Sequence, residues 1–243
     1  MANPIKIKCV VSAIIAHNDS VFTVKLQLTR RLPNYLPGQF LHLALDSFDP
    51  STGFWPESRV FSIASAPFEP ETTIAYAVKG KFTERMRDEL SVGKEVWVKL
   101  PYGHFTLSAT PNEEVILVAG GTGITPFISF ISMELNRPTG MLLKLVYGVR
   151  KPELFLFKYI LFEAVSNLKG FQLSVFCEER ASIINEFPVQ QGIITLDGTW
   201  AMPQNPFNAT FYLSGPIEMI RTFKNGLTDK GIDHNKIRID EWE

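Results

Sequence analysis

The chain has 243 residues, 45% of them hydrophobic, and a formal net charge of −1, so it can bury one large core or two modest ones. The near-zero charge gives no electrostatic footprint for nucleic acid or an anionic membrane. Its two cysteines, far apart and without CxxC spacing, exclude a cysteine-ligated iron–sulfur cluster or Cys₄ zinc site within this chain. No signal-peptide core, metal-ligand spacing of histidines or G-x-S-x-G motif occurs, and we expect a cytoplasmic protein without a metal or hydrolase chemistry.

The N-terminal part of the chain, residues 1–110, predicts an antiparallel domain of short strands and one helix. His17–Ser20 predicts a hairpin turn. Apolar residues at helical spacing from Phe82 to Leu90, with Gly93 just past the end, predict the helix. Short strands with regular turn signals favour a Greek-key β-barrel of six strands. The expected strands are Lys6–Ile15, Val21–Leu28, Phe40–Leu45, Val60–Ala64, Thr73–Val78 and Glu95–Leu100.

A strand, a glycine turn and a helix start follow one another in the middle of the chain. The apolar run Val115–Ala119 predicts a strand buried on both faces, as in parallel sheets. Gly120–Gly123 allow a sharp turn and close backbone approach, and Pro126 opens an apolar-periodic helix with Thr125 as its predicted N-cap. This arrangement offers free N–H groups and a positive dipole end to a phosphate. A tight turn without a ligand is the alternative, because the three-glycine fingerprint is incomplete.

Strands and helices alternate over residues 111–243, which predicts a doubly wound α/β domain with a five-stranded parallel sheet. Residues 181–205 show no clear pattern. The expected strands are Val115–Ala119, Leu142–Val149, Phe171–Phe176, Thr210–Leu213 and Lys236–Asp240, and the expected helices are Thr125–Asn136, Glu153–Asn167 and Ile217–Lys230. Ligands bind beyond the carboxyl ends of such strands. The segments expected there are Gly120–Pro126, Tyr147–Arg150, Cys177–Arg180, Ser214–Pro216 and Glu241–Glu243.

Several short motifs occur in the order typical of one family. They are Pro37-Gly38-Gln39-Phe40, Arg59-x-Phe61-Ser62, Gly80-Lys81-Phe82-Thr83, Leu100–Phe105, Gly120–Pro126, Ser214-Gly215-Pro216 and an aromatic residue near the C-terminus. On these motifs the chain resembles the ferredoxin–NADP⁺ reductase superfamily over essentially its whole length. The resemblance implies a barrel that binds FAD, with FMN possible, and an α/β domain that binds NADPH or NADH. It also implies hydride transfer from nicotinamide C4 to flavin N5.

The resemblance assigns flavin contacts to the first domain. In this family the arginine of the R-x-Y/F-S motif pairs with flavin phosphate, a role that suits the guanidinium fork of Arg59. Taken alone, Arg59 could be solvated and Phe61 could be a core residue. Phe61 would stack on the flavin and Ser62 would lie near its N5, while Gly80–Thr83 would clamp the pyrophosphate. The implied contacts are Arg59, Val60, Phe61, Ser62, Tyr76, Val78, Gly80, Lys81, Phe82, Thr83 and, from the tail, Trp242.

The resemblance assigns nicotinamide contacts to the second domain. The pyrophosphate would lie at Gly121, Thr122, Gly123, Thr125 and Pro126, and the nicotinamide at Ser214, Gly215 and Pro216, where serine replaces the family's cysteine. Arg150, Lys151 and Arg180 follow strand ends where a 2′-phosphate would favour NADPH, whereas Glu178-Glu179 would repel one. Trp242 would cover the flavin and Glu241 would relay a proton; a frayed terminus is the alternative. The implied catalytic residues are Ser62, Ser214 and Glu241.

Three functions remain open at this stage. The first is an FAD-holding NAD(P)H reductase, a monomer that serves a separate ferredoxin, flavodoxin or oxygenase component. The second is an NAD(P)H:flavin reductase that releases its flavin, favoured by Phe61 and by Lys81-Phe82, which stand where the family usually has tyrosine and a second small residue. The third is an electron-transfer or regulatory subunit that is inactive alone.

Overall fold

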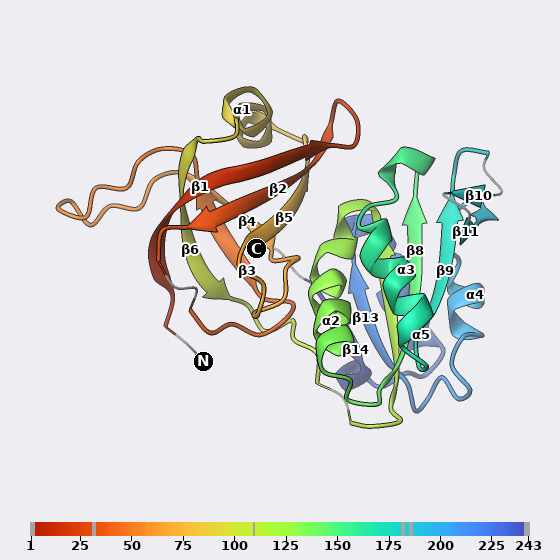
Figure 1. The fold of residues 1–243 in the computed structure, drawn as a ribbon. Helices are drawn as coiled ribbons and strands as arrows, with labels where there is room; N and C mark the ends of the chain where they lie inside the picture. The colour runs from red at the N-terminus through yellow and green to blue at the C-terminus, as the bar shows by residue number, and fades with distance from the viewer. Residues whose placement is uncertain (1–2, 31–32, 109, 181–182, 185–186, 241–243) are drawn as a thin grey trace. The chain divides into compact units, whose positions relative to one another are not determined.

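The computed structural model describes every residue except 1–2, 31–32, 109, 181–182, 185–186 and 241–243 (Figure 1). Its contacts divide the chain into two compact units, residues 1–106 and 107–243. The boundary that we predict from the sequence, between residues 110 and 111, lies a few residues beyond this division. Within the described part of the chain, no helix is long and apolar enough to cross a membrane.

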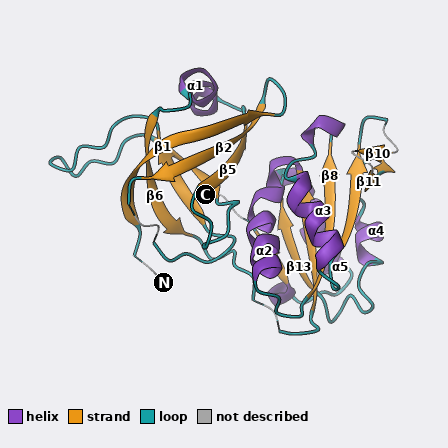
Figure 2. Cartoon of the chain, viewed as in Figure 1, coloured by secondary structure: helices purple, strands orange, loops and turns teal. Residues whose placement is uncertain are grey.

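The first unit is an antiparallel, nearly closed six-stranded barrel with one helix, as predicted (Figure 2). Its sheet order is β4-β3-β6-β1-β2-β5, in which β6 returns between β3 and β1. The edge strands β4 and β5 contact each other without ladder pairing. The bounds are β1 Ile5–Ala16, β2 Val21–Leu28, β3 Phe40–Ala44, β4 Ser58–Ser62, β5 Thr72–Ala77, α1 Lys81–Glu89 and β6 Glu95–Tyr102.

The barrel core follows from strand alternation, which points every second side chain inward. On β1 the inward residues Ile7, Cys9 and Val11 are at most 1% exposed. On β6, Val96 and Val98 are fully buried beside them in the same cluster. The predicted hairpin of β1 and β2 is present, with a register shift between Val11 and Ala13.

Strand β4 begins and ends two residues earlier than the predicted Val60–Ala64. The backbone N–H of Ile63 donates to Gln39 O at 3.0 Å, and that of Ala64 donates to Thr73 O at 2.8 Å. The bond of Ile63 continues the register with β3, in which Ser62 pairs with Phe40, so the chain changes partner to β5 at Ala64. This change of partner cannot be read from the apolar pattern, which continues through Ala64.

The second unit is a doubly wound α/β domain whose sheet is parallel in every pair, in the order β12-β9-β8-β7-β13-β14. Phe130 of α2 contacts Tyr212 on one face, while Phe211 and Leu213 share a cluster with Phe223 of α5 on the other. The bounds are β7 Glu114–Gly120, α2 Thr125–Asn136, β8 Leu142–Val149, α3 Lys158–Asn167, β9 Gln172–Cys177, β10 Ile183–Ile184, β11 Phe187–Pro188, β12 Gln190–Gln191, α4 Leu196–Trp200, β13 Thr210–Ser214, α5 Ile217–Asp229 and β14 Ile237–Ile239.

The predicted count of five strands is wrong, because the sheet has six. The additional strand is β12, whose two residues pair with the end of β9. It lies in the region 181–205, which also holds the β10–β11 hairpin and α4. A two-residue strand has no periodicity of its own, so only its pairing partner defines it.

Helix α3 begins at Lys158 and not at the predicted Glu153. Phe157 has a positive φ of 56°, which an α-helix cannot continue through. Upstream, the buried hydroxyl of Tyr147 donates to Leu154 O at 3.2 Å and accepts from the N–H of Leu156 at 3.4 Å. The carbonyl of Leu154 and the N–H of Leu156 are thus bonded to a side chain, whereas in a longer helix they would form hydrogen bonds within the helix.

Candidate functional site

The first group of site residues lies where β4 and α1 approach each other in the barrel. The Arg59 guanidinium carbon lies 5.2 Å from the centre of the Phe82 ring, which is in the first turn of α1. The sequence-predicted phosphate arginine and the predicted phosphate clamp are therefore adjacent, although they are 23 residues apart in the chain. The first N–H groups of a helix have no acceptors within the helix, so this turn can bind an anion.

The geometry of Gly80 fits a phosphate. Gly80 is the N-cap of α1 and has no side chain to cap it, and a Cβ placed there would meet no atom within 4 Å. The Thr83 hydroxyl accepts from the N–H of Lys79 at 2.9 Å and from that of Gly80 at 3.1 Å. It thereby holds the entry to the helix, and the exposed Lys79 and Lys81 flank this open surface.

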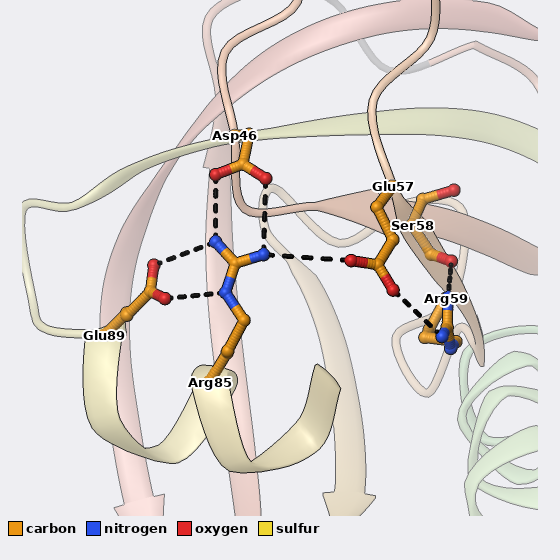
Figure 3. Close-up of polar contacts among 6 residues, drawn as sticks. All are labelled: Asp46, Glu57, Ser58, Arg59, Arg85 and Glu89. Carbon is orange, nitrogen blue, oxygen red and sulfur yellow. Dashed lines mark hydrogen bonds and ion pairs between the residues drawn. The ribbon is translucent and has the colours of Figure 1, made fainter. Parts of the chain in front are cut away.

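Arg59 itself is engaged with an acidic neighbour (Figure 3). Its Nη2 lies 3.0 Å from Oε1 of Glu57, and its Nη1 donates to Ser58 O at 2.9 Å. Both side chains of this ion pair are 53% exposed. Glu57 was missed by the sequence analysis, although it stands two residues before Arg59 and directly before the first residue of β4.

A second arginine, Arg85 of α1, lies on the other side of Glu57 (Figure 3). Its Nε lies 2.8 Å from Glu89 Oε1, its Nη2 lies 2.9 Å from Asp46 Oδ1, and its Nη1 lies 3.9 Å from Glu57 Oε2. The hydrogen bonds that Arg85 donates to Asp46 and Glu89 raise the pKa of Arg85 further above its ordinary value. The hydrogen bond from Arg85 likewise lowers the pKa of Asp46.

Several of the predicted flavin contacts lie mostly inside the barrel. Phe61 is only 8% exposed and packs edge-to-face against Tyr76, with ring centres 6.2 Å apart. Tyr76 is 3% exposed and stacks on Phe22, while Val78 packs against the same core. Phe61 therefore contributes to the core, the alternative that its residue type left open. Ser62, at the end of β4, is also buried.

In the second unit, two predicted loops pack directly against each other at the carboxyl ends of β7 and β13. A Cβ on Gly123 would lie 2.3 Å from Ser214 O and 2.5 Å from Gly215 N. Gly215 has a positive φ of 149°, and a Cβ on it would lie 2.9 Å from Gly120 N. Gly123 and Gly215 are needed because backbone meets backbone, a contact that no side chain allows.

Gly121 differs from its neighbours in facing open space. Its φ is +54°, and a Cβ there would meet nothing within 4 Å. It begins a 3₁₀ turn, Gly121–Ile124, that leads into α2. The predicted N-cap role of Thr125 is wrong, because Ile124 is the N-cap and the Thr125 hydroxyl donates to Thr122 O at 2.6 Å. The hydroxyl therefore closes the turn.

Ser214 is held by a residue that the sequence analysis did not single out. Its Oγ lies 3.0 Å from Oδ2 of Asp240, and the two residues are only 1% and 4% exposed. The backbone N–H of Asp240 donates to Leu213 O at 2.9 Å, which continues the pairing of β13 and β14. A carboxylate at the last position of the last predicted strand, Lys236–Asp240, was the available signal. The predicted Glu241 and Trp242 lie outside the described residues.

The basic residues expected near a 2′-phosphate are exposed at the ends of β8 and β9. Lys151 pairs with Glu179 at 3.2 Å, which raises the pKa of Lys151. Arg150 and Arg180 are exposed. Glu179 thus neutralises one of the three cations expected near a 2′-phosphate.

Comparison with known proteins finds a matching family model for part of the chain and solved structures with the same fold. Residues 117–225 match the family model of the oxidoreductase NAD-binding domain. The FAD/NAD-binding domain of nitric oxide dioxygenase from Vibrio cholerae superposes with a TM-score of 0.79 at 19% identity, covering 97% of this chain and 98% of that one. A ferredoxin–NADP⁺ reductase from Neisseria gonorrhoeae, solved with bound FAD and NADP, gives 0.77 at 18% identity and covers 99% of both chains.

Curated relatives match most of this chain at low sequence identity. The flavohemoprotein of Bordetella pertussis is 23% identical over 220 residues, which cover 86% of this chain and 53% of that protein. The electron transfer component of 2-halobenzoate 1,2-dioxygenase from Burkholderia cepacia is 27% identical over 212 residues, covering 85% and 58%. The chain thus spans about half the length of the curated relatives it matches. Residues 117–225 are thus similar to an oxidoreductase NAD-binding domain, and the chain has the two-domain fold seen in the Neisseria gonorrhoeae ferredoxin–NADP⁺ reductase, the fold that the sequence motifs predicted.

Proposed function

We propose that this protein is a flavin-dependent NAD(P)H reductase that takes hydride from nicotinamide and passes electrons to a separate acceptor. The observation that carries the proposal is the adjacency of Arg59 to the open N-terminal turn of α1, in a chain whose second unit is an NAD-binding domain. A bound flavin supplies the conversion of two-electron hydride chemistry to one-electron transfer. The acceptor is a separate oxygenase, ferredoxin or flavodoxin component, since a dioxygenase electron transfer component is among the relatives.

The chain's own residues have binding and orienting roles in this function. Arg59 and the α1 turn bind the flavin phosphate, because a guanidinium and free N–H groups both complement an anion. Gly121 leaves the space that a nicotinamide-nucleotide pyrophosphate needs beside α2. Asp240 accepts a hydrogen bond from the Ser214 hydroxyl, and this bond fixes the direction in which the lone pairs of the Ser214 oxygen point. Ser214 would then position the nicotinamide through an oriented hydroxyl.

A second candidate is an NAD(P)H:flavin reductase, in which flavin is a released substrate. One observation favours it specifically. Glu57 occupies the guanidinium of Arg59 at 3.0 Å, and a carboxylate at that place opposes phosphate binding. A reductase of this kind would be purified without much flavin and would still turn over when flavin was added.

The deciding experiment is an absorbance spectrum of the purified protein, repeated anaerobically after addition of NADPH or NADH. Bound flavin that is bleached by one nucleotide would support the proposed reductase and identify its donor. A colourless protein that oxidises nicotinamide only with added flavin would favour the flavin reductase. A colourless protein that is inert with added flavin would contradict both and leave a binding or regulatory subunit.

A further inference from the structure

Glu57 lies between two arginines, and among the described ion pairs only Arg85 has carboxylate partners besides Glu57. Arg85 is fixed by Glu89, four residues along the same helix, and by Asp46, so its guanidinium keeps its position with or without Glu57. Arg59 has only one carboxylate partner among the described ion pairs, and that partner is Glu57. Glu57 is therefore mainly the ion-pair partner of Arg59, and it is not required to fix the position of Arg85 on α1.

The position of Glu57 on Arg59 is the position that a phosphate would use. A phosphate bound by a guanidinium fork needs two adjacent N–H groups. Of the five N–H donors of Arg59, one on Nη2 is bonded to Glu57 and one on Nη1 to the carbonyl oxygen of Ser58, so a negative carboxylate already lies at the fork. A phosphate oxygen therefore takes the place of the Glu57 carboxylate or is repelled by it.

The charges of the cluster lead to the same conclusion. Two guanidinium groups face the three carboxylates of Asp46, Glu57 and Glu89, so these five side chains carry a net charge of −1. A phosphate monoester brings further negative charge to this surface. Movement of Glu57 towards Arg85 lowers that repulsion, because Glu57 Oε2 already lies 3.9 Å from Arg85 Nη1.

We infer that Glu57 is an internal competitor of the flavin phosphate: it occupies Arg59 in the free protein and transfers to Arg85 when the phosphate binds. This inference rests on the proposed function, since it requires that Arg59 binds flavin phosphate. Glu57 thus determines affinity for phosphorylated flavins without itself contacting the isoalloxazine ring. It weakens their binding and favours their release.

The test is Glu57→Gln in the full chain, with flavin fluorescence titrated against FMN and riboflavin at low ionic strength. The two ligands share the ring and the ribityl chain and differ by the phosphate alone. Because exposed ion pairs contribute at most about 1 kcal/mol, FMN affinity should rise about threefold to fivefold while riboflavin affinity stays unchanged. The gain should shrink at high salt, where exposed charges are screened.

Glu95→Gln is the matched control. Glu95 is an exposed glutamate of the same unit that pairs with Lys8 at the same distance of 3.0 Å, so its replacement changes the net charge equally but leaves Arg59 untouched. FMN affinity should not change in this variant. An equal gain in Glu95→Gln would assign the effect to overall charge and overturn the inference.

Arg59→Ala, alone and combined with Glu57→Gln, distinguishes a failure of this inference from a failure of the proposed function. Weaker FMN binding in Arg59→Ala and no gain from Glu57→Gln in that background would support competition at Arg59. A full gain without Arg59, a rise in riboflavin affinity, or unchanged FMN affinity in Glu57→Gln would overturn the inference and leave the proposed function standing. Unchanged FMN affinity in Arg59→Ala would contradict the phosphate role of Arg59, and therefore both the inference and the proposed function.

Discussion

The Ser214 hydroxyl donates to a carboxylate that is only 4% exposed. A buried charge that loses a donor keeps its desolvation cost, whereas an exposed serine can exchange its bond for water. The Ser214–Asp240 pair should therefore matter for stability as well as for the placement of the nicotinamide. Serine at this place retains a strong hydrogen-bond donor, which a cysteine thiol is not.

Replacement of Ser214 by alanine should lower the free energy of unfolding by about 1–3 kcal/mol, because Asp240 loses a hydrogen bond in a buried place. Ser214→Cys should fall between the wild type and alanine. Urea unfolding measures both. Ser166→Ala is the control: its hydroxyl bonds Phe162 O on the exposed side of α3, so its change should stay within about 0.5 kcal/mol. Equal urea midpoints for Ser214→Ala and the wild type would show that the pair adds nothing.

At the scale of elements, strands β7 and β8 are tied to the loop before β13 by a nearly buried ion pair. Lys144 Nζ lies 2.7 Å from Glu114 Oε1 and donates to Met202 O at 2.7 Å, while Glu114 accepts from the N–H of Gln204 at 2.9 Å. Burial disfavours ionisation of Glu114, but these hydrogen bonds outweigh it, so the pKa of Glu114 lies below its usual value.

This shift predicts acid sensitivity. The pKa of Glu114 is lower in the folded state than the value of about 4.3 in an unfolded chain, so its stabilisation is complete above that value and disappears as the pH falls through the folded pKa. Glu114→Gln should unfold more easily at neutral pH, by as much as about 3–5 kcal/mol, and should lose less stability on acidification. Chemical unfolding across the acidic range checks this against the exposed Glu95→Gln. Parallel pH curves for the wild type and Glu114→Gln would refute the assignment.

At the scale of the whole molecule, each unit has a hydrophobic core of its own. One cluster includes Leu41 and Val98 and lies entirely within residues 1–106, and another includes Ile116 and Phe211 and lies entirely within residues 107–243. Both units are within the usual size of independently folding domains. All the residues that we assign to the flavin phosphate belong to the first of them.

We therefore expect each unit to fold when it is expressed alone. Residues 107–243 should show cooperative thermal unfolding and a near-ultraviolet circular dichroism signal from packed aromatic residues. Residues 1–106 should bind FMN more tightly than riboflavin, since Arg59 and the α1 turn are both present. A fragment that lacks a cooperative transition would show that its core depends on the rest of the chain.

The sequence alone determined the order of the elements and the class of fold. Hydrophobic patterning is a local property. It predicted the barrel strands and helix α2 because burial of one face repeats every second or every third to fourth residue, and the continuous apolar run Val115–Ala119 predicted a strand buried on both faces. The motifs likewise predicted which residues lie at strand ends. Their order along the chain was enough to predict the superfamily fold.

Tertiary structure alone decided which of these residues meet. Glu57 on Arg59 and Arg85, Asp240 on Ser214, and Gly123 against Gly215 are contacts between elements, and they depend on strand register and on how closely two loops approach. The same holds for β12, which exists only through its pairing with β9. Local patterns carry no information about register between distant segments, because many pairings would bury the same apolar faces and only the packing of the whole domain selects one.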